Sequence, residues 1–391
     1  MGVGARPMIA GARSLLFVAT EDWFIASHFE PMVERALADG WRVTIAARPS
    51  GAHHRLEAKG AHFVALDIGR TAMGPQAVVR DARALQKIID RIRPDVLHAI
   101  ALKPAALATL TRGPRLVLAV TGLGYLSTSK ALKDQIARRA ALAMIGTAVR
   151  SGRGAALFEN RDDCAAVAAA SGPLPDRRVA FAPGAGVDPQ RLAPLPDPDD
   201  ATLHVGLVAR MIRSKGVDVA AEAVRRLRDQ GLDVDLTLAG APDPDNPGAI
   251  AASTLQAWRA QGGVTWLGRV EDVAGFWTGM HIACLPSRGG EGLPRSLLEA
   301  AAHARAIVTT NVPGCRDLVR QGIEGLIAPP DDVDALAAAI STLAADPARR
   351  RAMAAAARRR IEEGFTITHV QAAAAAAWAA ALETTQRKAA S

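Results

Sequence analysis

Short apolar segments alternate with helical patterns twice along the 391 residues, and this alternation constrains the fold more than any other feature. It is typical of parallel sheets covered by helices. A stretch at 183–200 that holds five prolines separates the two series. Such a composition indicates a connection between domains. The sequence therefore predicts an α/β protein with two tandem doubly wound domains that face each other across a cleft.

The expected elements set the domain boundaries. We predict an N-terminal domain over 1–185, a linker over 186–199 and a C-terminal domain over 200–365. Residues 366–391 are too rich in alanine to form a core, so we expect a C-terminal helix there that returns to the N-terminal domain. The expected strands are 15–19, 42–46, 62–66, 96–99, 116–119, 203–207, 234–238, 264–267, 282–285 and 306–309, and the expected helices are 30–38, 75–92, 131–149, 217–230, 249–260, 294–304, 334–345 and 347–363.

The positive charge of the chain is unevenly distributed. The formal net charge is +8, but residues 1–185 carry +10 and residues 186–391 carry −2. Such asymmetry indicates a nucleic-acid surface, an anionic membrane surface or a polyanionic ligand. Aromatic residues form only 4% of the chain and do not interleave with the basic ones. Because base-stacking platforms need that interleaving, nucleic acid is the weakest of the three partners.

Residues 131–149 are predicted to form a basic amphipathic helix. Leu132, Ile136 and Ile145 share its apolar face, and residues 101–150 carry eight lysines and arginines against one acid. Two interpretations stay open. The helix could pack on its own sheet with a solvated basic face, or it could dock on an anionic lipid leaflet.

Cysteine usage and hydropathy indicate the compartment. The three cysteines lie far apart without a C-x-x-C pair, which excludes a disulfide framework and a structural zinc site. The apolar stretch 15–19 is stopped by acidic residues and suits a core strand better than a signal peptide. No uncharged apolar run approaches the ~20 residues that cross a bilayer. We expect a cytoplasmic protein, peripheral on the inner face of the cytoplasmic membrane.

A glycine-rich segment at 289–300 follows the strand expected at 282–285. Glycines let the backbone approach a ligand, and Pro294 suits the first position of a helix whose N–H groups bind an anion. Glu291 and Glu299 add carboxylates that can accept hydrogen bonds from a sugar diol. The alternative is that Glu291 stabilises the helix start and Glu299 is solvated.

Arg210 and Lys215 follow the first strand of the second series. On one loop before a helix, they can reach the same phosphates, arginine through its planar fork and lysine as a point charge. For the R-x4-K pattern alone, a solvated loop is the alternative. Combined with the glycine-rich segment, the two cations indicate a pocket for a nucleoside diphosphate sugar.

The R-x4-K and E-x7-E patterns resemble the retaining glycosyltransferases of family 4, which have the GT-B fold. Segments at 240–247, 266–270 and 312–317 are similar to the branch that builds bacterial capsule, O-antigen and lipid-linked oligosaccharides. The resemblance implies neither a cofactor nor a divalent metal, since two cations stabilise the leaving group instead. It also implies that Glu299 binds the ribose, that Arg210 and Lys215 bind the diphosphate, and that Glu291 binds the transferred hexose. By the same resemblance, the backbone of Gly292, Leu293 and Pro294 contacts the phosphate and sugar, and the backbone at Val270 contacts the base.

The first half is expected to bind the acceptor. His28 follows the first strand, and we place His98 and Lys103 beyond the fourth, where the lysine would neutralise an acceptor phosphate. Gly122 lies in a turn after the fifth strand, where many members of the family present a histidine, so a backbone contact is expected here. A helix-capping His28 and a solvated Lys103 are the alternatives.

These patterns predict a hexosyl or N-acetylhexosaminyl transferase. The expected donor is a UDP-sugar, and the expected acceptor is a lipid-linked polyprenyl diphosphate or a growing surface polysaccharide. A GT-B sugar-nucleotide epimerase and a nonenzymatic nucleotide-sugar-binding protein stay open as alternatives. A dinucleotide dehydrogenase is disfavoured, because no G-x-G-x-x-G follows the first strand of either series.

Overall fold

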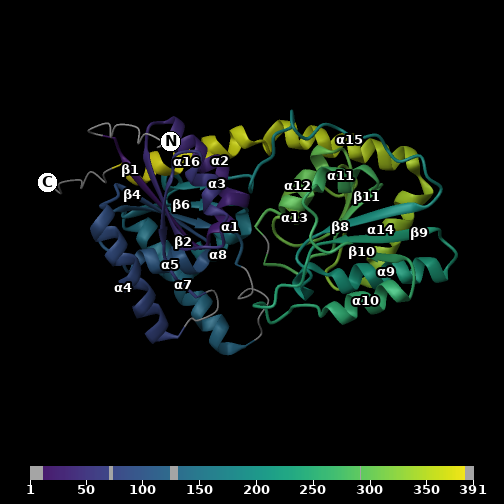
Figure 1. Cartoon of the computed structure of the whole chain (residues 1–391), viewed down its shortest axis with the longest axis horizontal. Coiled ribbons are helices and arrows are strands. Elements are labelled where there is room, and N and C mark those ends of the chain that lie inside the picture. Colours follow the sequence, from purple (N-terminus) through teal and green to yellow (C-terminus); the bar gives the residue numbers. More distant parts are fainter. Residues whose placement is uncertain (1–11, 70–73, 124–130, 291, 384–391) are drawn as a thin grey trace, which may run out of the picture. The chain divides into compact units, whose positions relative to one another are not determined.

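The chain folds into two compact units, each built on one parallel sheet (Figure 1). The computed structural model describes residues 12–69, 74–123, 131–290 and 292–383. The first unit comprises the described parts of 12–121, 132–185 and 370–383, and the second consists mainly of 186–369.

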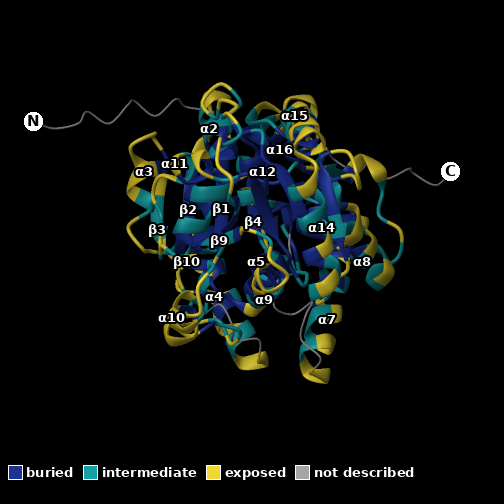
Figure 2. Cartoon of the chain, turned by 90° about the vertical axis from the view of Figure 1, so that its right-hand side faces the viewer, coloured by how far each residue is buried: buried dark blue, intermediate teal, exposed yellow. Residues whose placement is uncertain are grey.

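The first unit contains a seven-stranded sheet with the order β3-β2-β1-β4-β5-β6-β7. Residues 15–18 of the inner strand β1 are fully buried, as in a parallel sheet covered on both faces, and the inner strands are dark blue in Figure 2. The strands are β1 (Ser14–Glu21), β2 (Arg42–Arg48), β3 (His62–Ala65), β4 (Val96–Ile100), β5 (Arg115–Val120), β6 (Gly154–Phe158) and β7 (Val179–Phe181). The helices are α1 (Asp22–Phe24), the π-helix η1 (Ile25–Phe29), α2 (Glu30–Ala38), α3 (His53–Glu57), α4 (Pro75–Ile92), α5 (Leu102–Thr109), α7 (Leu132–Arg150), α8 (Arg161–Ser171) and the 3-10 turn η2 (Asp176–Arg178).

The second unit repeats the design with a six-stranded sheet in the order β10-β9-β8-β11-β12-β13. Its strands are β8 (Leu203–Val208), β9 (Val234–Ala239), β10 (Val264–Trp266), β11 (Ile282–Leu285), β12 (Ala306–Thr310) and β13 (Gly325–Ala328). Its helices are the 3-10 turn η3 (Arg213–Lys215), α9 (Val217–Asp229), α10 (Ala252–Ala260), α11 (Val273–Thr278), α12 (Arg295–Ala302), α13 (Cys315–Leu318), α14 (Val333–Ala345) and α15 (Pro347–Gly364). In both sheets the first strand lies beside the fourth, and ligands of doubly wound folds bind where the strand order reverses in this way.

The last helix, α16 (Ile367–Leu382), packs on the core of the first unit, as the sequence predicted. The Trp378 Nε1–H donates to Nδ1 of His98 over 3.1 Å, and both rings are buried. The Arg178 guanidinium donates to the carbonyls of Ala380 and Glu383, each over 3.1 Å. His98 therefore lies inside β4, and its predicted position beyond the fourth strand is wrong. Burial lowers the pKa of His98 to about 3 and keeps its ring neutral.

The proline-rich segment at 186–199 is bound to the rest of the second unit by hydrogen bonds and an ion pair. Arg305 donates to the carbonyl of Pro196 over 2.8 Å, and Arg350 pairs with Asp197 over 3.0 Å. His303 Nδ1–H donates to the carbonyl of Ala193 over 2.8 Å. These contacts satisfy polar groups of a segment that has no strand partner over most of its length.

Within the part of the chain that the structure describes, no helix is both long and apolar enough to cross a bilayer.

Candidate functional site

Two loops of the second unit, one after β8 and one after β11, are bonded to each other. The Arg288 N–H and the Ser287 hydroxyl both donate to the Ser214 carbonyl, over 2.8 and 3.1 Å. Gly216 adopts φ +69°, and a Cβ there would lie 1.9 Å from the Pro286 carbonyl oxygen. The close approach of the two backbones thus requires glycine at this position.

The Arg288 side chain strengthens the same junction. Its guanidinium makes a bidentate pair with Asp218 over 2.7 and 3.0 Å. It also pairs with Asp331 and donates to the Arg213 carbonyl. Arg288 thereby connects the R-x4-K loop, α9 and the segment after β13. No sequence motif marked this residue, because an arginine before a glycine-rich turn has no distinctive spacing.

The two predicted phosphate-binding cations lie on the loop after β8. Arg210 is exposed, and its guanidinium pairs with the largely buried Asp243. Lys215 is half-buried and ends the short turn η3. Since Lys215 immediately precedes Gly216, the contacts of Ser214 and Gly216 fix the backbone on both sides of the lysine.

The glycine-rich segment leads into α12, whose N-cap is Pro294 rather than the first helical residue that the sequence predicted. Gly292, Leu293 and Pro294 are buried. Glu299 is 14% exposed, and its Oε1 accepts a hydrogen bond from Nε of Arg295 over 2.7 Å. Its carboxylate is therefore neither fully solvated nor unpaired. Glu291 lies outside the described residues.

The loop after β12 also contacts this segment. A Cβ on Gly314, where φ is +79°, would lie 1.5 Å from the carbonyl oxygen of Gly292. Val270, after β10, is half-buried against the core that contains Leu293. The structure thus brings Lys215 and Gly292 to loops at the carboxyl ends of one parallel sheet, where ligands of such folds bind, and Glu299 to the helix α12 that follows one of these loops.

The three predicted acceptor residues have different environments. His28 is half-buried on the π-helix η1, with Nδ1 2.7 Å from the hydroxyl of Ser27. Gly122, after β5, is buried with φ +94°. Lys103 is 7% exposed and pairs with the buried Asp81 over 2.9 Å. The ammonium of Lys103 is thus engaged within its own unit.

A buried carboxylate that sequence reasoning missed lies beside η1. Asp22 is fully buried and accepts hydrogen bonds from Ser50, through N–H and hydroxyl, and from His53, through N–H and Nδ1–H. Burial alone would raise the pKa of Asp22, but these hydrogen bonds outweigh it and lower the pKa to about 2. The carboxylate therefore ties the segment after β1 to the loop after β2.

Two family models match the two units separately. Residues 14–149 match a family described as glycosyl transferase 4-like, and residues 202–346 match one described as glycosyl transferases group 1. The second match contains Arg210, Lys215, Glu291 and Glu299. The chain belongs to the family 4 glycosyltransferases. The GT-B fold and the family resemblance read from the motifs are confirmed.

Curated relatives agree with this membership. N,N'-diacetylbacillosaminyl-diphospho-undecaprenol alpha-1,3-N-acetylgalactosaminyltransferase of Campylobacter jejuni is 22% identical over 82% of this chain and 86% of its own length. Other curated relatives match over shorter stretches, from 9 to 42% of their own length.

Solved structures share the fold of this glycosyltransferase at low sequence identity. Sucrose-phosphate synthase from Thermosynechococcus elongatus has a TM-score of 0.72 at 18% identity, over 92% of this chain and 96% of its own. Anabaena HepE, solved in complex with UDP and glucose, has a TM-score of 0.70 at 16% identity, over 93% of this chain and 99% of its own. At such identities the likeness establishes the fold alone.

Proposed function

We propose that this glycosyltransferase moves a hexose or N-acetylhexosamine from a UDP-sugar, with retention, to a lipid-linked polyprenyl diphosphate or a growing surface polysaccharide. The observation that carries the proposal is the junction at Ser214, which holds the Lys215 loop against the glycine-rich segment. A diphosphate bound there meets a cation from one loop and helix-terminal backbone from the other.

Each predicted donor residue has a part in this proposal. Arg210 and Lys215 bind the diphosphate and stabilise the charge that develops on it as the sugar leaves. Glu299 binds the ribose hydroxyls, and Glu291 holds the transferred sugar. The backbone of Gly292, Leu293 and Pro294 contacts phosphate and sugar, and the backbone at Val270 contacts the base. The complexes of Anabaena HepE with UDP-glucose and UDP support a uridine nucleotide.

The acceptor is assigned to the first unit. The proposed contacts are His28, on the π-helix η1 that follows β1 and α1, and the backbone of Gly122, just after β5. An acceptor phosphate could reach Lys103 only in competition with Asp81. The lipid diphosphate in the name of the Campylobacter relative supports an acceptor of this chemistry.

Surface residues of the first unit support a peripheral position on the inner face of the cytoplasmic membrane. On α7, Leu132 is 71% and Ile136 61% exposed, next to the exposed Lys133 and Arg139. Exposed aliphatic side chains among basic ones suit an anionic lipid surface, because the apolar groups enter the interface and the cations meet the headgroups.

Donor turnover tests the proposal directly. The full chain is incubated with UDP-glucose, UDP-galactose, UDP-N-acetylglucosamine or UDP-N-acetylgalactosamine, with and without a membrane lipid extract. We expect UDP release that depends on the extract, and an anomeric configuration in the product, read by NMR, that matches the donor. Lys215→Ala and Glu291→Ala should abolish release, while Arg225→Ala, an exposed arginine on α9, should not.

The same assay separates the alternatives. Conversion of the UDP-sugar without an acceptor would identify an epimerase. Tight UDP-sugar binding without UDP release on any lipid acceptor would identify a binding protein. Wild-type turnover by both Lys215→Ala and Glu291→Ala would show that the site is elsewhere.

A further inference from the structure

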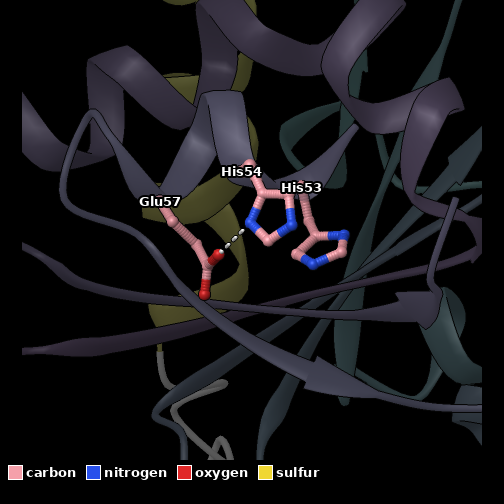
Figure 3. A group of neighbouring side chains, drawn as sticks. All are labelled: His53, His54 and Glu57. Atoms are coloured by element: carbon pink, nitrogen blue, oxygen red, sulfur yellow. Dashed lines mark hydrogen bonds and ion pairs between the residues drawn. The ribbon is translucent and has the colours of Figure 1, made fainter. Parts of the chain in front are cut away.

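Three potential metal ligands lie together on α3, at the carboxyl end of β2. His53, His54 and Glu57 each offer one ligand atom, and these atoms all lie within 4.8 Å of one another. Figure 3 shows the two imidazole rings side by side, with Nδ1 of His54 3.2 Å from Oε2 of Glu57. In the spacing H-H-x-x-E, Glu57 lies four residues after His53 and three after His54, and residues three or four apart are neighbours on a helix surface.

The environment of His53 is that of a metal-ligating histidine. Its Nδ1–H donates over 2.7 Å to the buried, ionised Asp22, so its Nε2 is the nitrogen that remains as a base. Metal-bound histidines almost always donate their other N–H in this way, which fixes both tautomer and ring orientation. The ring also stacks on Phe63, with centroids 4.0 Å apart and planes at 19°.

We propose that His53, His54 and Glu57 form a zinc site with water in the fourth position. Two imidazoles and one carboxylate suit Zn²⁺, whereas Mg²⁺ and Ca²⁺ prefer all-oxygen sites. On binding, His54 and Glu57 would exchange their mutual hydrogen bond for bonds to the metal. Cysteine spacing, which argued against structural zinc, carries no information about a site made of histidine and carboxylate.

Zinc binding to the tag-free full chain tests the site. After chelator treatment and buffer exchange, the protein is titrated with Zn²⁺ by calorimetry, and bound metal is counted after equilibrium dialysis. We expect one Zn²⁺ per chain, with at least tenfold weaker binding in His54→Ala and Glu57→Gln, whose side chains are exposed. Asp22→Asn should weaken binding about 10- to 100-fold, as for other residues that orient a metal-bound histidine.

His62→Ala is the matched control, because His62 is an exposed histidine on the neighbouring strand β3 and lies outside the cluster. It should bind zinc as the wild type does. The proposal is overturned if the wild type binds no zinc at micromolar concentrations, or if His54→Ala and Glu57→Gln bind it unchanged. Neither readout depends on glycosyl transfer, so the zinc site and the proposed transferase activity stand or fall separately.

Discussion

Arg288 forms more contacts between the loops of the second unit than its place outside the motifs would indicate. With 22% of its side chain exposed, it pairs with Asp218 and Asp331 and donates to a carbonyl of the R-x4-K loop. Burial alone would lower the pKa of Arg288, but these two carboxylates raise it, so the cation is permanent. We interpret Arg288 as a positioning residue for Lys215.

Replacing Arg288 should therefore impair catalysis more than stability. Arg288→Ala frees the loop that carries Lys215, and we expect kcat/KM for the UDP-sugar to fall at least tenfold, about 1.4 kcal/mol of transition-state stabilisation. Steady-state kinetics with varied donor measures this, and Arg288→Lys should recover part of the loss. Arg225→Ala serves as control, and an unchanged kcat/KM in a folded Arg288→Ala variant would contradict the positioning role.

Asp22 gives the first unit a defined pH dependence. Its pKa is 3.8 in an unfolded chain and about 2 in the folded protein, so at pH values above 3.8 it contributes about 2 kcal/mol to the free energy of unfolding. Because the pKa is lowered on folding, this contribution disappears as the pH falls from 3.8 through about 2. Denaturant titrations should show Asp22→Asn destabilised at neutral pH, with the gap to wild type shrinking over that window.

The exposed Asp39, paired with Arg35 four residues earlier, is the natural comparison. An exposed pair of this kind contributes about 0.5 kcal/mol. Asp39→Asn should therefore alter the free energy of unfolding little at any pH. A gap between wild type and Asp22→Asn that stays constant down to pH 2 would show that the ionised carboxylate is not what stabilises the fold.

Residues that belong to motifs could be placed from the sequence, and residues that act through distant partners could not. Lys215 was placed on the loop after a strand, and Glu299 in the helix that follows the glycine-rich segment, because spacing and neighbouring glycines mark such segments. Asp22 accepts hydrogen bonds from Ser50, which lies 28 positions later in the sequence, and Arg288 pairs with Asp218, which lies 70 positions earlier. Pairings over these distances depend on strand order, which one sequence does not reveal.

At the scale of elements, α7 combines a buried end with an exposed one. Ala141, Leu142, Ile145 and Val149 pack into the first unit, whereas Leu132 and Ile136 nearer its start face solvent. A groove along α4 presents a further exposed aliphatic side chain, Val79, which is 46% exposed among basic side chains. The helices α4 and α7 both pack on α5. The first half of α7, which carries Leu132 and Ile136 and is not packed into the core, is the part that we expect to contact the membrane.

Vesicle binding tests this assignment. Replacing Leu132 and Ile136 together by serine removes two aliphatic groups worth about 1.5–3 kcal/mol each when buried, so partitioning onto vesicles rich in phosphatidylglycerol should fall at least tenfold. Ile323→Ser, an exposed aliphatic residue of the second unit, is the control. Binding that ignores the anionic lipid content would contradict the electrostatic part of the proposal.

Long periodic elements were predicted closely, whereas three short strands were missed. The expected helices at 75–92 and 347–363 match α4 and α15 closely, because both carry strong end signals. The missed strands β6, β7 and β13 each contain alanine or glycine, which are depleted in strands, so their strand signal is weak. The helix α5 begins after Ala101, whose φ of +73° no propensity anticipates, and this start places Lys103 in the interior.

At the scale of the whole molecule, residues from the far end of the sequence complete the first core. Trp378 on α16 reaches His98 on the central part of the first sheet and packs near Phe17 and Trp41. The N-terminal series of strands and helices is therefore incomplete without the C-terminal helix. Trp378 combines a large apolar ring with an N–H donor, so it both fills this core and reaches His98.

Trp378→Phe tests the contribution of this hydrogen bond, because it keeps an aromatic ring in place and removes the N–H that donates to His98. Leaving Nδ1 of a buried, neutral histidine without a partner should cost about 1–3 kcal/mol. Chemical denaturation measures the loss, which should be the same at pH 5 and pH 8 because the pKa of His98 lies near 3. A loss that grew over this range would show that the ring titrates there.

The chain enters and leaves the second unit at adjacent points. Val187 and Thr366 form a parallel bridge, with N–H of Val187 bonded to the carbonyl of Phe365 and N–H of Ile367 bonded to the carbonyl of Val187. Residues 186–369 are thus an insertion with neighbouring ends in the sequence of the first unit. Under the proposed function, exchange of this one segment at this junction would replace the nucleotide-sugar-binding residues and leave the proposed acceptor residue His28 in place.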